Sequence, residues 1–313
     1  MIEINQIKSA YKRIQKYVYR TPLLINKEID DYVGAEIFFK CENFQPTGSF
    51  KIRGVTNAIQ QLKNRDLQNG LATVSSGNHG AALSLAAKRK LTNATVVMPS
   101  NTPKVKIENV KRYGGNIFWC EPNQNSREKV LKDIVTSDRS TIIHPYNDEK
   151  IIAGQATVAL EMIQDQPNLD CIISPVSGGG LLSGTLSYTK KEKPHIEIFG
   201  AEPDEANDTF VSLEKGKIIP NKTTNTICDG LRAQIGTLTY PIIAKFVDEI
   251  ITVSDSEVIF AMRMIWERLK VIIEPSCSIT LAALIKSKSK FRNKKVGLIM
   301  SGGNVDLDHL PWK

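Results

Sequence analysis

Residues 171–184 read Cys-Ile-Ile-Ser-Pro-Val-Ser-Gly-Gly-Gly-Leu-Leu-Ser-Gly, a short apolar run that leads directly into three glycines. Such a run is typical of a strand in a parallel sheet that helices cover on both faces. The glycines predict a tight turn at which a helix begins, and the N–H groups of a helix start favour an anion. The spacing matches neither the dinucleotide fingerprint nor the nucleoside-triphosphate loop. The turn therefore predicts either a site for another phosphate-bearing ligand or a purely structural turn. Its residues are Ser177, Gly178, Gly179, Gly180 and Leu181.

The same alternation of short β-branched runs and helix-length segments continues along the chain. Further strands are predicted at 37–42, 71–76, 94–99, 116–120, 141–144, 197–202, 249–253 and 296–301. Helices are predicted at 81–90, 104–113, 126–136, 154–164 and 257–270. This order predicts an α/β protein with parallel sheets, and the number of strands suits two sheets better than one. The polar loops near 64–70 and 147–150 are the expected boundaries. We therefore expect a large domain of residues 1–66 and 149–313 and a small domain of residues 67–148.

The composition is that of a soluble globular protein. Hydrophobic residues make up 41% and charged residues 24% of the 313 residues, which allows a sizeable core. Met1 is followed by an amphipathic stretch of mixed charge, so we expect no secretory signal, and no run is long and apolar enough to predict a membrane span. The five cysteines are scattered and form no Cys-x-x-Cys pair, which predicts reduced thiols in a cytoplasmic protein.

The net charge of +8 raises the question of a nucleic-acid partner. Lysine and arginine recur most densely at 286–295, just before a predicted buried strand. No nucleic-acid-binding motif accompanies this run, so it favours a solvated surface link. We therefore expect no nucleic-acid partner.

Two further turns combine a strand end with glycines and small polar residues: Ser-Ser-Gly-Asn-His-Gly at 75–80 and Ser-Gly-Gly-Asn at 301–304. In such folds ligands lie beyond the carboxyl ends of strands, so convergence of all three turns on one cleft would make a ligand site. Donors at 75–80 could bind a carboxylate, although Asn78 and His79 could equally cap a helix. Lys51 stands among small and apolar neighbours, and a partly buried lysine becomes a usable amine nucleophile, whereas a surface lysine would not.

In this order the motifs resemble the fold type II pyridoxal-phosphate enzymes, and within them the serine racemase and serine/threonine dehydratase group. The resemblance includes Lys-Cys-Glu-Asn at 40–43 and Thr-Gly-Ser-Phe-Lys-Ile-Arg-Gly at 47–54, and it extends from 20–23 to 301–307. It implies a tryptophan synthase β-like α/β fold, with two open, mostly parallel twisted sheets covered by helices. It also implies that the small domain is mobile and closes over the substrate.

The resemblance implies a pyridoxal 5'-phosphate site around Lys51, which would hold the cofactor as a Schiff base. Phe50 and Asn78 would flank the ring, with Asn78 contacting its 3'-oxygen, and the backbone of 177–181 would hold the phosphate. Ser301 would face the pyridine nitrogen, and a hydroxyl is a weak partner that leaves this nitrogen largely unprotonated. The ring is then a poorer electron sink, which favours β-elimination of water from a β-hydroxy amino acid.

Ser76 resembles the serine that stands opposite the lysine in serine racemases. Two proton-transfer groups on opposite faces, Lys51 and Ser76, are what racemisation needs, although several hydroxyaspartate dehydratases also have this serine. Arg127 matches a position near the substrate cleft, where it would bind a second carboxylate or pair with an acid on the domain surface. The residues expected to bind the substrate carboxylate are Ser75, Ser76, Gly77, Asn78 and His79.

A metal site is implied at Glu202, Ala206 and Asp208. From spacing alone, a solvated acidic loop is the alternative interpretation. The racemase-like enzymes place a divalent cation at residues that match the two carboxylates and the Ala206 carbonyl, and Mg²⁺, Mn²⁺ or Ca²⁺ suits such oxygen ligands. We expect the ion to be structural or activating and remote from the reacting carbon.

The chain departs from the mammalian racemases near their nucleotide-effector site. Pro46, Ala81 and Tyr146 stand where those enzymes carry lysine, glutamine and asparagine. This argues against activation by ATP, although Lys106 and Tyr113 match the pattern.

Together these features predict a cytoplasmic, homodimeric serine racemase with serine/threonine dehydratase activity, which acts on a β-hydroxy amino acid. The alternative within the class is a threo-3-hydroxyaspartate ammonia-lyase, and a cysteine-forming β-replacement synthase fits Ser76 and the metal loop less well. The alternative from another class is a non-catalytic protein that binds amino acids or nucleotides. Cys277, where a small residue is usual beside the cofactor, favours a small buried hydrophobe over a reactive thiol.

Overall fold

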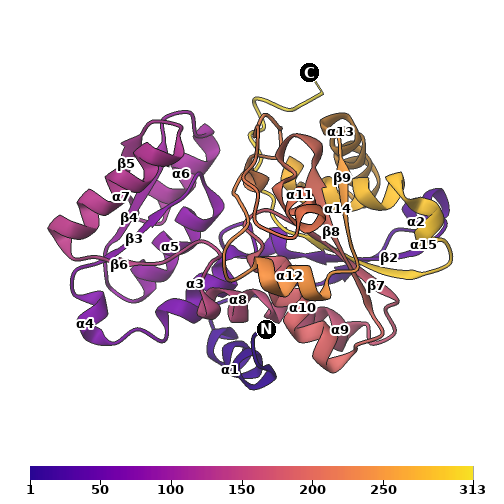
Figure 1. Cartoon of the computed structure of the whole chain (residues 1–313), viewed down its shortest axis with the longest axis horizontal. Helices are drawn as coiled ribbons and strands as arrows, with labels where there is room; N and C mark the ends of the chain where they lie inside the picture. The colour runs from indigo at the N-terminus through magenta and orange to yellow at the C-terminus, as the bar shows by residue number, and fades with distance from the viewer. Residues whose placement is uncertain (313) are drawn as a thin grey trace.

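The computed structural model describes residues 1–312, apart from the side chain of Gln124, and consists of two sheets surrounded by helices (Figure 1). The strands are β1 (Leu23–Leu24), β2 (Glu36–Cys41), β3 (Leu71–Val74), β4 (Ala94–Pro99), β5 (Asn116–Cys120), β6 (Thr141–Ile142), β7 (Cys171–Pro175), β8 (Glu197–Pro203), β9 (Glu249–Val253) and β10 (Lys295–Met300). The α-helices are α1 (Ile4–Ile14), α2 (Lys27–Val33), α3 (Lys51–Ile59), α4 (Asn64–Leu67), α5 (Asn78–Arg89), α6 (Lys104–Arg112), α7 (Gln124–Asp138), α8 (Glu149–Gln155), α9 (Thr157–Asp165), α10 (Gly180–Glu192), α11 (Asp208–Lys215), α12 (Tyr240–Phe246), α13 (Asp255–Met264), α14 (Pro275–Lys286) and α15 (Lys288–Phe291). Short 3₁₀ segments are η1 (Glu42–Phe44), η2 (Asp204–Ala206) and η3 (Asp229–Leu231), and η4 (Ile265–Leu269) is π-helical.

The larger sheet has the strand order β1-β2-β10-β7-β8-β9. Its neighbours pair in parallel except β1 with β2, where Leu23 lies opposite Lys40. Helices α2, α13 and α14 supply the core on one face, and α1, α8, α9, α10 and α12 supply it on the other. Cover on both faces explains why β7 is buried at every residue and lacks polar alternation.

The smaller sheet has the order β5-β4-β3-β6, and all its neighbours pair in parallel. It lies apart from the larger sheet, at the left of Figure 1, and α5 packs against both the small sheet and α3. The expectation of an α/β protein with two mostly parallel sheets is therefore confirmed. The strands of this sheet fall between residues 71 and 142. The domain limits at 67 and 148 stay a prediction.

Several predicted elements have different ends in the structure. The strands predicted at 71–76, 141–144 and 171–177 stop at Val74, Ile142 and Pro175, because the residues that follow form the loops of the site. The helix predicted at 154–164 is part of two helices, α8 and α9. The first of these begins inside the expected boundary loop 147–150, since the Asp148 carboxylate accepts hydrogen bonds from the N–H groups of Lys150 and Ile151. The two-residue strand β1 and the short helix α4, which lies in the loop 64–70, were not predicted.

The backbone joins the beginning of α3 to the end of β10. Phe50 N–H donates to the Ser301 carbonyl at 3.1 Å, and Ser49 forms a β-bridge with Gly302. Lys51, the first residue of α3, is therefore held beside the carboxyl end of the larger sheet. Within residues 1–312, no helix combines the length and apolar character needed to cross a lipid bilayer.

Candidate active site

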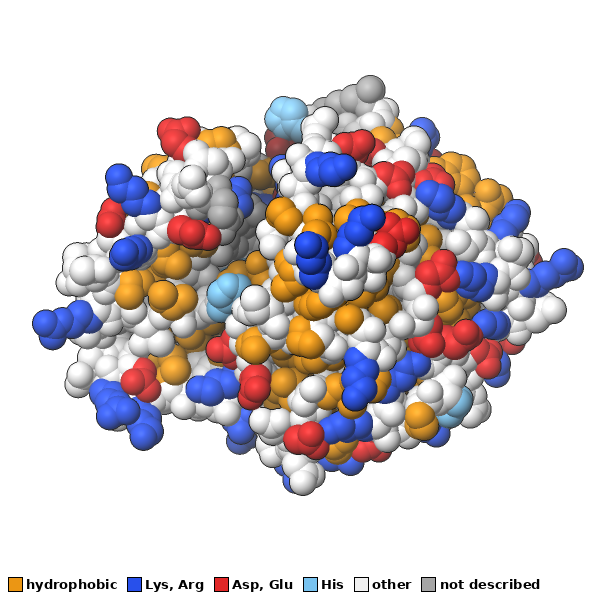
Figure 2. Space-filling view, in the orientation of Figure 1, with side chains coloured by type: hydrophobic (Ala, Val, Ile, Leu, Met, Phe, Trp, Pro, Cys, Tyr) orange, Lys and Arg blue, Asp and Glu red, His pale blue; other side chains and the backbone are white. Residues whose placement is uncertain are grey.

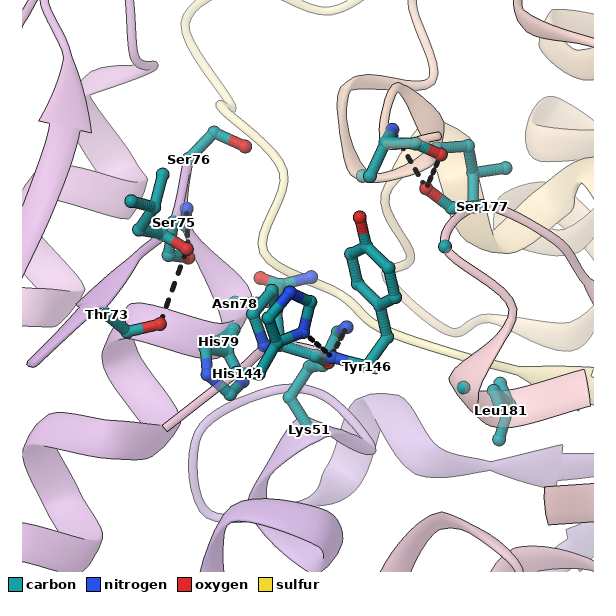
Figure 3. Close-up of a pocket in the computed structure, with 18 of the residues that line it drawn as sticks. Lys51, Thr73, Ser75, Ser76, Asn78, His79, His144, Tyr146, Ser177 and Leu181 are labelled. Atoms are coloured by element: carbon teal, nitrogen blue, oxygen red, sulfur yellow. Dashed lines mark hydrogen bonds between the residues drawn. The ribbon is translucent and has the colours of Figure 1, made fainter. Parts of the chain in front are cut away.

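The three turns singled out in the sequence meet at one cavity of about 410 Å³ between the two sheets. Figure 3 shows Lys51, Ser76 and Ser177 around it, each from a different element. The predicted cofactor and substrate residues that line it are Phe50, Lys51, Ser75, Ser76, Gly77, Asn78, His79, Arg127, Ser177, Gly178, Gly179, Gly180, Leu181 and Ser301. The structure thus brings together residues that are up to 251 positions apart (301 − 50).

Lys51 presents its amine inside this cavity. Its Nζ donates to the Pro145 carbonyl at 3.1 Å and lies 5.2 Å from the centre of the Phe50 ring. Burial lowers the pKa of Lys51 from 10.5 to about 8, because the charged form is poorly solvated there. An amine with this pKa is available as a nucleophile near neutral pH.

The turn after β7 forms a cradle that only glycine fits. A Cβ on Gly178 would lie 2.4 Å from the Tyr146 ring, and Gly179, with φ of +86°, would bring one to 2.8 Å from Thr239. The thirteen-residue helix α10 begins here, and the first N–H groups of a helix have no partner within it. Ser177 Oγ is bound to the backbone of Ala233, which it contacts at 3.0 and 3.3 Å. The arrangement fits a phosphate held by backbone N–H groups.

The turn after β3 is capped by Ser75. Its Oγ accepts hydrogen bonds from Gly77 N–H at 3.1 Å and Gly80 N–H at 2.9 Å, at the beginning of α5. The interpretation of Asn78 and His79 as caps is therefore wrong, because the serine before them fills that role. Ser76 is exposed at the cavity wall, across the cavity from Lys51 in the view of Figure 3.

Asn78 and His79 are held by other parts of the chain. The Asn78 amide donates to Glu274 Oε1 at 2.6 Å and accepts from the Asn304 amide at 2.8 Å, so its orientation is set. His79 Nε2 lies 3.1 Å from the Ile143 carbonyl, which requires the proton on Nε2. Burial, and then the nearby Lys51, lower the pKa of His79 to about 3, so this imidazole is neutral at physiological pH.

Arg127 and His144 lie at the same cavity. Among the described residues, no carboxylate forms an ion pair with Arg127, and its Nε is buried without a hydrogen-bond partner. Of the two roles left open for Arg127, pairing with a surface acid is therefore not seen among these residues, and Arg127 lines the cavity as an available cation. His144 Nδ1 accepts from Asn147 N–H at 2.9 Å, so a neutral ring carries its proton on Nε2, and burial lowers the pKa of His144.

Glu202 and Asp208 form a pair of buried carboxylates away from the cavity. Their exposed fractions are 0% and 2%. Burial, and then Asp208, raise the pKa of Glu202 to about 8, and burial raises that of Asp208 to about 6. Within the described part of the chain, neither is in an ion pair with a basic side chain, and no cluster of three or more His, Cys, Asp or Glu side chains has a geometry suited to a metal. All four carboxylate oxygens accept hydrogen bonds, from the N–H groups of Thr209, Phe210 and Ile235 and from the Asn221 amide. The pair has no basic partner, so a divalent cation bound beside the buried Ala206 would offset its charge.

The sequence did not predict a set of ion pairs that joins the part of the chain around the small sheet to the part around the larger sheet, at the edge of this cavity. Lys106 of α6 forms ion pairs with Asp229 at 2.5 Å and Glu274 at 3.1 Å. Glu274 in turn holds Asn78, as described above. Of the three residues in these ion pairs, only Lys106 had been noted in the sequence, as a match to the nucleotide-effector pattern and not for this contact. Residues from distant segments meet here, so no local motif could have signalled the contact.

The structure favours a structural role for Cys277 and a surface role for the basic run 286–295. Cys277 is fully buried, and burial raises its pKa well above the ordinary value, as expected of a small hydrophobe. The other cysteines are also free and buried. Lysines of the run 286–295 pair with Glu257, Glu249, Glu197 and Glu36. On the face shown in Figure 2, acidic and basic side chains are interspersed, so no continuous basic surface is visible there.

Comparison with known proteins gives a consistent answer over almost the whole chain. The family described as "Pyridoxal-phosphate dependent enzyme" matches residues 14–302. A serine racemase of Dictyostelium discoideum is 46% identical, over 99% of this chain and 97% of the relative. A beta-hydroxyaspartate dehydratase of Paracoccus denitrificans is 41% identical, over 97% of this chain and 96% of the relative. The solved structure of maize serine racemase has a TM-score of 0.96 at 46% identity, over 98% of this chain and 95% of that chain.

Proposed function

The chain belongs to the family of pyridoxal-phosphate dependent enzymes, and we propose that it interconverts L- and D-serine and also eliminates water from β-hydroxy amino acids. The observation that carries this proposal is the joint placement of a low-pKa lysine, Lys51, and a serine, Ser76, around one cavity that ends in a glycine cradle. The relatives named racemase and dehydratase match the chain nearly from end to end, which supports both reactions.

The cofactor residues proposed are Phe50, Lys51, Asn78, Ser177, Gly178, Gly179, Gly180, Leu181 and Ser301. The N-terminal end of α10 would hold the phosphate, and Lys51 would hold the cofactor covalently. When bound, pyridoxal phosphate withdraws electrons from the bonds at the substrate Cα. Ser301 would offer the ring nitrogen only a neutral hydroxyl, which favours loss of a β-substituent.

Two side chains would move protons at the substrate Cα. Lys51, once free as an amine, takes the proton of an L-amino acid on its own face. Ser76 stands on the opposite face and returns a proton there, which gives the D-amino acid. The N-terminal end of α5, with Ser75, Gly77, Asn78 and His79, would bind the substrate carboxylate.

Closure of the small domain, residues 67–148, would exclude water from the substrate. Helix α6 and the residue after it contact the larger part of the chain through the side chains of Lys106, Asn109 and Tyr113. These contacts would hold the small domain in the closed position. Small-angle scattering tests this, since a substrate analogue should reduce the radius of gyration, and an unchanged value would contradict closure.

Incubation with L-serine, followed by quantification of D-serine and pyruvate, tests the main proposal. Ser76→Ala should lose D-serine formation and keep pyruvate formation, whereas Ser137→Ala, which changes an exposed serine on α7, should behave as wild type. Lys51→Ala should lose both products and the Schiff-base absorbance. A colourless wild-type protein with no product would refute the proposal and favour a non-catalytic amino-acid-binding protein.

The second candidate is a threo-3-hydroxyaspartate ammonia-lyase, which the unpaired Arg127 guanidinium favours. A substrate with a second carboxylate would pair with this half-buried cation, as serine cannot. The Paracoccus relative named beta-hydroxyaspartate dehydratase is consistent with it. Release of keto acid from threo-3-hydroxyaspartate and from L-serine separates the candidates. Arg127→Gln should lower kcat/KM for hydroxyaspartate alone, and equal losses for both substrates would exclude this role.

The cation is proposed at the carboxylates of Glu202 and Asp208 and the carbonyl of Ala206, as Mg²⁺, Mn²⁺ or Ca²⁺. The two buried carboxylates support this, because a cation would offset their mutual repulsion. Electron paramagnetic resonance of added Mn²⁺ measures the binding directly. Wild type should bind one ion that Asp208→Asn does not bind, and equal binding by both would refute the site.

We also propose that the protein is a homodimer in the cytoplasm. Three apolar side chains, Tyr19, Phe44 and Ile272, are exposed, and hydrogen bonds from Tyr19 to Gln45 and from Asn43 to the Ile272 carbonyl join their segments, which supports an interface there. Light scattering should report twice the chain mass for wild type and a shift towards monomer for Ile272→Glu. A wild-type monomer would refute the dimer.

A further inference from the structure

Four charged side chains are fully buried, and one of them belongs to the helix that begins with Lys51. They are Lys40 on β2, Glu42 on η1, Arg53 on α3 and Glu161 on α9, with exposed fractions of 0%, 0%, 0% and 1%. None of the four lines the cavity. The reaction proposed above therefore does not use them directly.

Arg53 is the centre of this cluster because it holds both carboxylates with two bonds each. Its Nε and Nη2 donate to Glu42 at 2.7 and 2.8 Å. Its Nη1 and Nη2 donate to Glu161 at 2.8 and 2.7 Å. A planar guanidinium fixes the directions of such paired bonds, which a flexible ammonium does not.

Lys40 completes the cluster from the neighbouring strand. Its Nζ donates to Glu161 at 2.8 Å and to the Thr21 carbonyl at 2.7 Å. Thr21 also donates its hydroxyl to Glu42 at 2.6 Å. Every side-chain nitrogen and oxygen of the four charged residues has a partner, and two cations balance two anions.

Electrostatics keep the cluster ionised in spite of its burial. Burial alone would raise the pKa of Glu42, but the contacts with Arg53 hold it below the ordinary value. Removing four charges from water is unfavourable, and well-packed apolar side chains of similar volume often give equal or greater stability. The stability of the fold therefore does not explain why this cluster is charged.

The position of Arg53 suggests a role for the directional bonds. It is two residues after Lys51, in the first turn of α3, so the two side chains point to different sides of the helix. Arg53 points into the larger part of the chain and joins α3 to η1 and α9. Lys51 points into the cavity, and Phe50 ties the same turn to Ser301.

We propose that Arg53 is a positioning residue, whose two paired carboxylate contacts fix the first turn of α3 and so aim the Lys51 amine at the reacting carbon. Together with the hydrogen bond from Phe50 N–H to the Ser301 carbonyl, the cluster sets where Lys51 lies relative to Ser301. A shift of this turn leaves the glycine cradle and the α5 turn in place, so binding survives while proton transfer suffers. This inference rests on the proposed function, since it assigns Arg53 to the same site.

The test uses the charge-balanced double variant Arg53→Met/Glu42→Gln. This variant removes the hydrogen bonds from Arg53 to Glu42 and Glu161 and keeps the Lys40–Glu161 ion pair. The matched control is Lys190→Met/Asp248→Asn, which removes another ion pair of 2.8 Å, far from the cavity entrance. Both holoenzymes are compared with wild type at a temperature at which thermal scans show all of them folded. The measurements are kcat and KM for L-serine and the visible circular dichroism of the bound cofactor.

The expected result is a kcat about 10- to 100-fold lower in the Arg53 variant, with KM within about threefold of wild type, because small misplacements of reacting groups have effects of this size. Its visible dichroism should also change, and the control should match wild type in both measurements. Arg53→Lys, which keeps the charge and loses the paired geometry, serves as the second variant and should show the same split if the double variant does not fold. Unchanged kcat and dichroism in a folded Arg53 variant would overturn the inference. Absence of cofactor binding by wild type would instead refute the proposed function.

Discussion

Attachment of pyridoxal phosphate to the apoprotein should follow the titration of Lys51 near pH 8. The amine, and not the ammonium ion, attacks the aldehyde of the cofactor, so the rate of attachment is proportional to the neutral fraction. Burial lowers the pKa of Lys51 from 10.5 to about 8, because it disfavours the charged form. The neutral fraction therefore rises at a lower pH than in an exposed lysine.

The size of the effect follows from the two pKa values. At pH 7 about a tenth of the Lys51 amines are neutral with a pKa of 8, against roughly one in three thousand with a pKa of 10.5. The rate constant should rise about tenfold per pH unit below pH 8 and level off above it.

Stopped-flow absorbance of the Schiff base, recorded between pH 6 and 10, measures this rate. Lys51→Met gives the background from other amines and is subtracted. A rate that climbs without levelling through pH 10 would show that the Lys51 pKa is not lowered, and it would refute the argument from burial.

Three further predictions concern stability, the cradle and the cation. Lys51→Met should stabilise the apoprotein against urea by up to about 3 kcal/mol below pH 8, and the difference should vanish towards pH 10.5. The reason is that a lowered lysine pKa destabilises the folded state only at pH values at which the lysine of the unfolded chain is protonated. Equal pH profiles of the free energy of unfolding for both proteins would contradict this. Gly178→Ala should weaken binding of pyridoxal phosphate about tenfold or more and leave dephosphorylated pyridoxal unaffected, because its Cβ meets the Tyr146 ring at 2.4 Å. Fluorescence titration measures both affinities, and if the added Tyr146→Ala change does not restore binding, the clash is not the cause. Mg²⁺ should raise the melting temperature of wild type and of Asp204→Asn, an exposed neighbour, but not that of Asp208→Asn; a response of all three would place the ion elsewhere.

The sequence predicted the fold well where local signals decide it. The glycines at 178–180 require a turn after a strand that is buried on both faces, and the structure has that strand, turn and helix as β7 and α10. The two-residue strand β1 has no such signal, because its pairing depends on β2. The limits of α8 were missed although Asp148 is a preferred N-cap residue, because the polar stretch 147–150 was interpreted as a boundary loop.

The candidate site could be predicted where its residues belong to motifs. Residues 75–79 and 177–181, Ser301 and Lys51 line one cavity, as convergence at strand ends suggested. The ion pairs between residues far apart in the sequence could not be predicted from motifs. Lys106 meets Glu274 across 168 positions (274 − 106), and Arg53 meets Glu161 across 108. Such contacts depend on how the sheets pack, which a single sequence does not reveal.

The central claim is that Lys51 and Ser76 serve opposite faces of the same substrate carbon. L-Serine labelled with deuterium at Cα tests it most directly, when loss of the label from remaining L-serine and formation of D-serine are followed together. The account predicts that Ser76→Ala still exchanges the label of L-serine for solvent hydrogen, because Lys51 removes and returns the proton on one face, while D-serine no longer forms. Formation of D-serine by Ser76→Ala at the wild-type rate would contradict it.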